Sequence, residues 1–244
     1  MLVSIARGAF LSLALGAGAA LADSTNDLAD FNAAAEAAES HNRVAIGYLR
    51  TGNLDLASLE LERLREAWTR LNDRFAGKWP AVFQDNAYSV MMRTDISTRL
   101  VTADLLLNSN HVDGARQSLM AVRKDFYDWR KSAGVEVLSD CIYDANVRMD
   151  MLMTFDGPAL DWSKPDAGSA ITAAASVYSK ALERCDGMAN ADLRQNPEFR
   201  RLVDGAKASM KFIPQAIADH DTDLLHRVLI ELRSFDNLLA FRFG

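Results

Sequence analysis

The sequence predicts an all-α protein, an up-and-down helical bundle built from repeated helical hairpins with about eight helices. Three observations lead to this prediction. Apolar residues recur at alternating spacings of four and three, the spacing of one face of a helix. That pattern occurs three times, each time after a similar turn. No segment shows the sustained two-residue alternation that is typical of a half-buried strand.

Residues 1–22 are predicted to be a signal peptide. Arg7 precedes an apolar segment, Ala9–Leu21, that is shorter than a membrane-spanning helix of roughly 18 or more residues. The small side chains at Ala20 and Ala22 favour cleavage after Ala22. Because no later segment is apolar enough to cross a bilayer, we expect residues 23–244 to be released as a soluble periplasmic or secreted protein. An uncleaved leader that acts as an anchor is the alternative.

The mature chain is predicted to be acidic. Loss of Arg7 with the leader lowers Lys+Arg from 27 to 26 against 33 Asp+Glu, which gives a net charge of −7. Proteins that bind nucleic acids or anionic membrane surfaces need clustered cationic side chains. Neither partner is therefore expected.

The two cysteines are predicted to form a disulfide within one hairpin, 137–186. Helices are expected at about 137–155 and 169–185, joined by a loop rich in Gly and Pro. Cys141 lies near the start of the first helix and Cys185 at the end of the second, so antiparallel packing brings them within about one turn. Export preserves such a bond, and two buried free thiols are the alternative. A metal-binding or redox pair is disfavoured because the sequence has no Cys-x-x-Cys.

An apolar seam that recurs in three copies is the most informative pattern. The second and third copies lie 58 and 168 residues after the first. The copies are Ala57, Leu61, Leu64, Trp68, Leu71 and Phe75; Ala115, Leu119, Val122, Phe126 and Trp129; and Leu225, Leu229, Leu232, Leu239 and Phe243. Asp236 is the single break. We expect the seams to be core rather than a cofactor site, because burial of one face is what stabilises a helix in a protein.

A tight turn precedes each seam. Gly52 and Asn110 suit the left-handed conformation that ends a helix, while Asn53 and Asp221 can cap the helix that follows. The unit is therefore a helix, a turn and a seamed helix. The three related hairpins are expected near 27–75, 83–132 and 197–243.

The first helix of the third hairpin has its own signals. Asn196 followed by Pro197 predicts a helix start, because an amide caps the helix and proline suits its first position. Pro214 is predicted to kink this helix, since it removes an internal hydrogen bond.

An arginine follows the third seam residue in every copy. These residues are Arg65, Arg123 and Arg233. We expect them to be structural, pairing with a carboxylate on a neighbouring helix or with helix-end carbonyls. A direct ligand role is the alternative, and their recurrence counts against it because a single ligand needs one site.

No motif for catalysis or cofactor ligation stands out, so we expect neither an enzyme nor a bound cofactor. The sequence lacks C-x-x-C-H, G-x-S-x-G, H-E-x-x-H and a glycine-rich phosphate loop. Its expected architecture loosely resembles exported bundles such as cytochromes c′ and cytochrome b562. That resemblance leaves a non-covalent haem open, with His41 or His226 and a methionine as ligands. Met149 and Met153, one helical turn apart, could bind Cu(I), although core packing is the favoured interpretation.

A calcium loop is also disfavoured. Asp219, Asp221 and Asp223 form a D-x-D-x-D run that resembles the start of such a loop. Its sixth position is Leu224 instead of Gly, and its twelfth is Ile230 instead of Glu.

The sequence therefore favours a non-enzymatic binding or scaffolding module with a protein or peptide as partner. The alternative is a bundle that carries haem or copper for electron transfer or metal handling. Trp79, Trp162 and Tyr48 are candidate anchors for a partner, but core positions are favoured for all three.

Overall fold

The computed structural model describes residues 16–84, 87–157 and 160–244, and within these ranges it contains helices and no strand. The predicted all-α helical bundle is confirmed. The α-helices are α1 (Gly16–Arg50), α2 (Leu54–Phe75), α3 (Ala87–Asn108), α4 (Val112–Ser132), α5 (Leu138–Met153), α6 (Ala167–Met188), α7 (Ala191–Gln195), α8 (Pro197–Met210), α9 (Ile213–Ala218) and α10 (Thr222–Phe243). A short 3₁₀ turn, η1 (Ala81–Phe83), follows α2.

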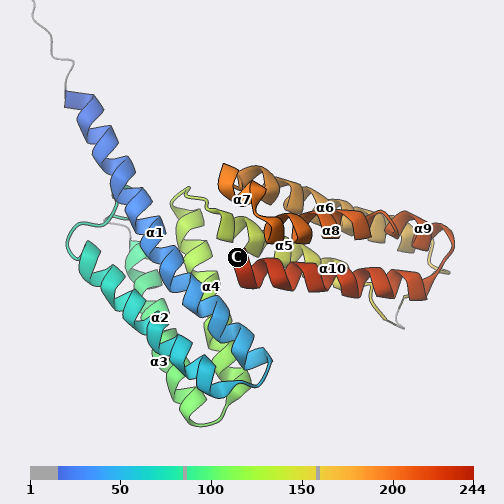
Figure 1. The fold of residues 1–244 in the computed structure, drawn as a ribbon, viewed down its shortest axis with the longest axis horizontal. Helices are drawn as coiled ribbons and strands as arrows, with labels where there is room; N and C mark the ends of the chain where they lie inside the picture. The colour runs from blue at the N-terminus through green and yellow to red at the C-terminus, as the bar shows by residue number, and fades with distance from the viewer. Residues whose placement is uncertain (1–15, 85–86, 158–159) are drawn as a thin grey trace, which may run out of the picture.

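The predicted signal peptide lies mostly outside the described residues. Its last residues, from Gly16, belong to the backbone of α1, whose first turns project beyond the rest of the molecule (Figure 1). No helix within the described ranges is both long and apolar enough to cross a membrane.

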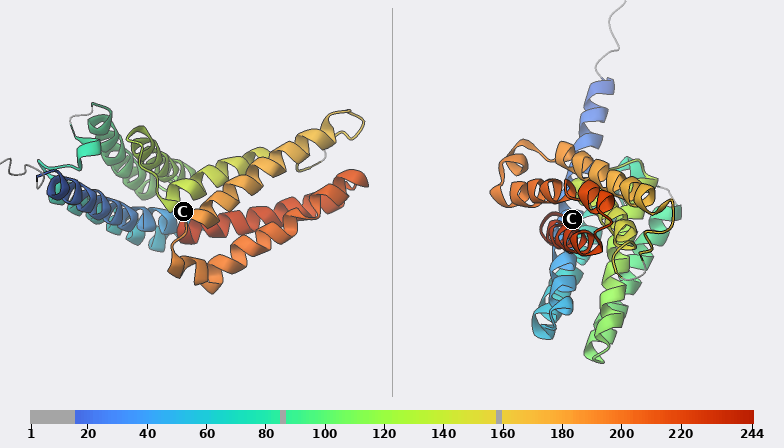
Figure 2. Two further views of the ribbon diagram at one scale, coloured as in Figure 1. Left: turned by 90° about the horizontal axis from the view of Figure 1, so that it is seen from above. Right: turned by 90° about the vertical axis from the view of Figure 1, so that its right-hand side faces the viewer.

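The helices form two antiparallel bundles, each with its own apolar core. The first core runs from Phe31 to Trp129 and is built by α1 to α4. The second runs from Cys141 to Leu239 and is built by α5, α6 and α8 to α10. The bundles are inclined to each other and meet near the C-terminus (Figures 1 and 2).

The three seams form the centre of these cores. Leu61, Leu119 and Leu229 are each at most 1 % exposed, and the other seam residues are buried, except Phe243, which is partly buried. Removing each leucine from water stabilises the fold by roughly 1.5–3 kcal/mol. The residue that breaks the third seam, Asp236, is buried as well, at 1 % exposure.

The turns before the seams share one backbone conformation. Gly52, Asn110 and His220 all have positive φ, at 76°, 59° and 51°. In each turn the next residue donates its N–H to a carbonyl five positions back, with N–O distances of 2.9, 2.7 and 2.9 Å. This bonding satisfies the carbonyls at the end of the first helix of the hairpin. The sequence predicted the first two left-handed residues and missed His220, since histidine adopts this conformation less readily than glycine or asparagine.

The predicted helix starts are confirmed. The side chains of Asn53 and Asp221 accept hydrogen bonds from the backbone N–H groups of Leu56 and Leu224. Asn196 caps α8 in the same way. The effect of Pro214 is larger than a kink, because α8 ends at Met210 and a separate helix, α9, begins at Ile213.

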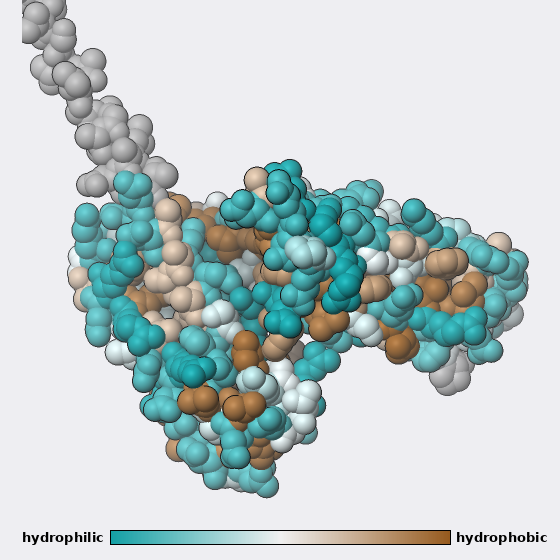
Figure 3. Space-filling view, in the orientation of Figure 1, coloured by the Kyte–Doolittle hydropathy of each residue, from teal (hydrophilic) through white to brown (hydrophobic). Residues whose placement is uncertain are grey.

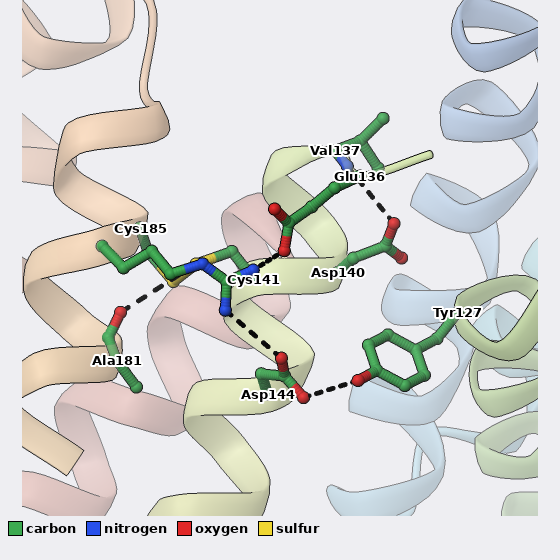
Figure 4. Close-up of a disulfide and its surroundings, with 9 residues drawn as sticks. Tyr127, Glu136, Val137, Asp140, Cys141, Asp144, Ala181 and Cys185 are labelled. Carbon is green, nitrogen blue, oxygen red and sulfur yellow. Dashed lines mark hydrogen bonds and ion pairs between the residues drawn. A yellow bond between two sulfur atoms is a disulfide. The ribbon is translucent and has the colours of Figure 1, made fainter. Parts of the chain in front are cut away.

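The predicted disulfide is confirmed. Cys141 of α5 and Cys185 of α6 are bonded, with their Cα atoms 5.5 Å apart (Figure 4). Arg184, one residue before the bond, pairs with Glu136 and with Asp144. The bond and these ion pairs together hold α6 against the start of α5.

Candidate functional site

A cleft of about 670 Å³ lies where the two bundles meet. Residues of α1 and α4 line it from the first bundle, and residues of α5 and α10 line it from the second. Figure 3 shows a hollow where the two bundles meet at an angle, and hydrophilic and hydrophobic surfaces lie side by side there. This volume lies within the range of small-molecule binding sites.

The lining of the cleft is cationic, although the whole chain has a net charge of −6. One carboxylate, Asp150, lies among the lining residues. The cationic lining residues are Arg43, Arg50, Arg116, Arg123, Lys124 and Arg233. Such a local reversal of charge favours anions at this position.

Four of these six cationic side chains form direct ion pairs with carboxylates, and two do not. The compensated residues pair as Arg43 with Glu36, Arg116 with Asp113, Lys124 with Asp128, and Arg233 with Asp150. Arg50 and Arg123 bond to neutral amides instead, at 3.2 Å to Asn237 and 2.7 Å to Asn146. Neither has a carboxylate partner in the part of the chain that the structure describes.

Arg123 carries the least satisfied guanidinium of the cleft. Its Nη1 donates to Asn146, whereas its buried Nε and Nη2 have no hydrogen-bond partner among the described residues. The group lies over the ring of Tyr143, 5.1 Å from its centre, and Gly244 packs against Nη2. Burial lowers the pKa of Arg123, so its charge is held at an energetic cost.

Arg43 adds a second buried guanidinium beside it. Its side chain is 8 % exposed, and its Nη2 donates to Glu36 at 2.8 Å. Its Nε and Nη1 also lack a partner within the described ranges. The positive charge of Arg43 further lowers the pKa of Arg123, against the opposing effect of Glu39.

Asp236 lies beneath the cleft and connects to Arg123 through one amide. Asn146 accepts from Arg123 with its oxygen and donates its Nδ2 to Asp236 at 2.5 Å. Burial raises the pKa of Asp236 to about 7, although Arg233 lowers it. The sequence flagged this position as the break in the third seam but not as part of a site.

A buried ion-pair network holds the two bundles at the edge of this region. Arg130 of α4 is 2 % exposed and bonds to Glu39 of α1 and Asp140 of α5. Its Nε and Nη2 hold Asp140 at 2.8 and 2.6 Å, and its Nη1 and Nη2 hold Glu39 at 2.7 and 2.8 Å. Tyr127 donates to Asp144 at 2.7 Å across the same junction (Figure 4). These bonds fix α4 against α5 and thereby set the width of the cleft.

The three repeated arginines have different surroundings. Arg65 pairs with Asp104 on the outer surface of the first bundle at 3.3 Å. Arg233 pairs with Asp150 at 2.5 Å and lies 3.4 Å from Asp236. Arg65 and Arg233 thus each contact a carboxylate of a neighbouring helix, whereas Arg123 bonds to an amide in place of the expected carboxylate or helix-end carbonyl.

The candidate haem and copper ligands do not gather at the cleft. His41 in the first bundle lies 2.7 Å from Glu60, and His226 in the second lies 2.6 Å from Asp156. Met149 is fully buried in the second core, and Met153 packs against that core. Among the described residues, no group of three or more His, Cys, Asp or Glu is arranged to hold a metal.

The candidate aromatic anchors lie against the cores, as favoured. Tyr48 and Trp79 pack on the first core. Trp162 packs on the second and donates its Nε1 to Thr222 at 2.8 Å.

Comparison with known proteins assigns no family. No protein-family model matches the chain, and no curated protein and no solved structure is significantly similar to it. The evidence on function therefore comes from the geometry of the cleft.

Proposed function

We propose that this chain is an exported, non-enzymatic binding module whose ligand enters the cleft between the bundles and carries an anionic group. The observation that carries this proposal is the buried Nε and Nη2 pair of Arg123, which has no partner within the described residues. The leader-like first 22 residues and the disulfide support export.

The energetics favour an anion here. A buried N–H group without a partner costs about 1–3 kcal/mol, and more when the group is charged. Arg43 and Arg123 present four such nitrogen atoms between them and also repel each other. An oxyanion would accept these hydrogen bonds and neutralise the excess charge. We therefore expect the protein or peptide partner, or any other ligand of the cleft, to carry an anionic group.

Thermal unfolding with inorganic sulfate tests this proposal. Ionic strength is held constant by exchange for chloride, and wild type is compared with Arg123→Gln and Arg65→Gln. Arg65 is the matched control, since it occupies the same repeat position outside the cleft. We expect sulfate to raise the Tm of wild type and of Arg65→Gln more than that of Arg123→Gln, because a ligand stabilises the folded state that binds it. Equal shifts in all three proteins would refute the proposed site.

A further inference from the structure

Building on the proposed function, we propose that the ligand is a small amphipathic oxyanion. Its carboxylate or phosphate head binds side-on to Nε and Nη2 of Arg123, and its apolar body lies on the apolar walls of the cleft. Three observations support the proposal. The edge of the Arg123 guanidinium formed by Nε and Nη2 has no partner among the described residues, apolar side chains line the cleft beside it, and the positive charge is concentrated in the cleft.

The free edge of Arg123 matches one that already binds a carboxylate in this protein. Arg130, two helical turns further along α4, holds both oxygens of Asp140 with its Nε and Nη2. Arg123 offers the same pair of atoms without a carboxylate among the described residues. Its Nη1 donates to Asn146 and its Cζ lies 5.1 Å from the centre of the Tyr143 ring, and these contacts hold the guanidinium in place. Because Nε and Nη2 are buried and Gly244 lies next to Nη2, an oxyanion reaches this edge when the groups that cover it move aside, and it then replaces them with two hydrogen bonds.

Apolar side chains beside this edge indicate that the ligand is more than an inorganic ion. Met120 is 49 % exposed and Val147 is 38 % exposed, and both line the cleft. Further apolar lining residues are Ile46, Ala240 and Phe241. An inorganic anion leaves these surfaces in water, whereas an alkyl or aryl body removes them at a gain of about 25 cal/mol per Å².

The distribution of charge favours a small ligand over a polyanion. The positive charge lies in the cleft, while the chain as a whole has a net charge of −6. A nucleic acid or a long acidic peptide would extend onto that acidic surface and be repelled. A ligand that fits within about 670 Å³ avoids the repulsion.

Isothermal titration of the whole mature chain tests the proposal with named probes. The amphipathic anions are octanoate and octyl phosphate, below their micelle concentrations. Acetate and inorganic phosphate supply the head without the body, and octylammonium supplies the body with the opposite charge. We expect one or both amphipathic anions to bind at least tenfold more tightly than the matching small anion, with no binding of octylammonium. The tighter of the two identifies the head group.

Variants locate the two parts of the ligand. Arg123→Gln should weaken octanoate at least tenfold, and Arg65→Gln should leave it unchanged. Arg123→Lys keeps the charge but lacks the paired donors, so it should also weaken binding and serves if the Gln variant does not fold. Met120→Ser, at an exposed position, should weaken octanoate without weakening acetate.

The outcomes separate this inference from the proposed function. If neither octanoate nor octyl phosphate binds more tightly than its matching small anion, or if hexaglutamate binds more tightly than both, the amphipathic ligand is overturned and an anion site is left in place. Absence of binding by every anion would overturn both. Binding that survives in Arg123→Gln and Arg123→Lys would place the ligand elsewhere and overturn the assigned head contact.

Discussion

Among single residues, Asp236 couples the core of the second bundle to the cleft. It occupies a seam position whose repeats are apolar, and it is 1 % exposed. The groups that face it are Arg233, Asn146, Asp150 and Arg123, together with the phenol of Tyr178, whose pKa is raised by burial and by this carboxylate. Its protonation therefore affects both the stability of the bundle and the charge of the cleft.

The stability of the fold should decline as pH rises from about 4 to about 7. The pKa of Asp236 is about 7 in the folded chain and about 3.9 in the unfolded chain. Between these values the folded state holds a proton that the unfolded state has released, so rising pH favours unfolding. The difference between these two pKa values corresponds to a loss of roughly 4 kcal/mol at most in the free energy of unfolding. Urea unfolding of wild type and Asp236→Asn should show a flatter profile in the variant, and identical slopes would contradict the assignment.

Anion affinity should depend on the same proton. Ionised Asp236 adds negative charge next to Arg123 and Arg233, so the cleft attracts anions less. We expect octanoate affinity to fall roughly two- to fivefold between pH 6 and pH 8, while octanoate itself stays ionised. In Asp236→Asn the affinity should be constant over this range. A pH dependence that persists in the variant would assign it to another group.

At the scale of elements, the repeated turns explain why three hairpins form from different sequences. Gly52, Asn110 and His220 place the chain in the left-handed region at equivalent positions. Gly52→Ala should lower the free energy of unfolding by about 1 kcal/mol, because a Cβ is disfavoured at positive φ. Gly187→Ala, in α6 with open space around it, should raise it by about 0.5–1 kcal/mol. Chemical denaturation measures the free energy of unfolding of both variants. A decrease in both variants would contradict this account.

The disulfide should stabilise the second bundle selectively. Cys141 and Cys185 lie in the second core and close a loop with a sequence separation of 44. Replacing both by Ser should cost about 2–4 kcal/mol through greater freedom of the unfolded chain. Hydrogen exchange should then rise in α5, α6, α8 and α10 and stay slow in α2 and α4. A uniform rise across both bundles would show that the bundles unfold as one unit.

These elements could be predicted because their causes are local. The seams, the caps at Asn53 and Asn196, and the disturbance at Pro214, which was predicted as a kink and is a full break between two helices, each depend on residues within a few positions of one another. His220 was missed for a local reason too, since histidine indicates positive φ less strongly than glycine or asparagine does.

At the scale of the whole molecule, the arrangement of the two bundles was beyond prediction from the sequence. Arg123 was singled out by the repeat, but Arg43, Asn146 and Asp236 come from three other helices. Their proximity depends on how the two bundles pack against each other. An apolar seam predicts only which residues are buried within one bundle. One such contact is Gly47 of α1, where a Cβ would lie 2.6 Å from the ring of Phe241 in α10.

Arg130 should be the most sensitive position of the junction. Arg130→Met leaves the carboxylates of Glu39 and Asp140 buried without their cation, which costs about 3–5 kcal/mol. Arg70→Met removes an exposed pair and should change stability by less than about 1 kcal/mol. Urea unfolding measures both, and similar losses in the two variants would show that the buried network does not hold the bundles together.

The claim that Arg123 is the anchor of an anion site is tested most directly by NMR of its side chain. The Nε–H resonance of Arg123 is assigned by its loss in Arg123→Lys and followed during titration with octanoate. The account predicts a saturable shift of this resonance at the affinity found by calorimetry, with the Nε–H of Arg65 unmoved. An unchanged Arg123 resonance at saturating octanoate, or equal shifts at Arg65, would contradict it.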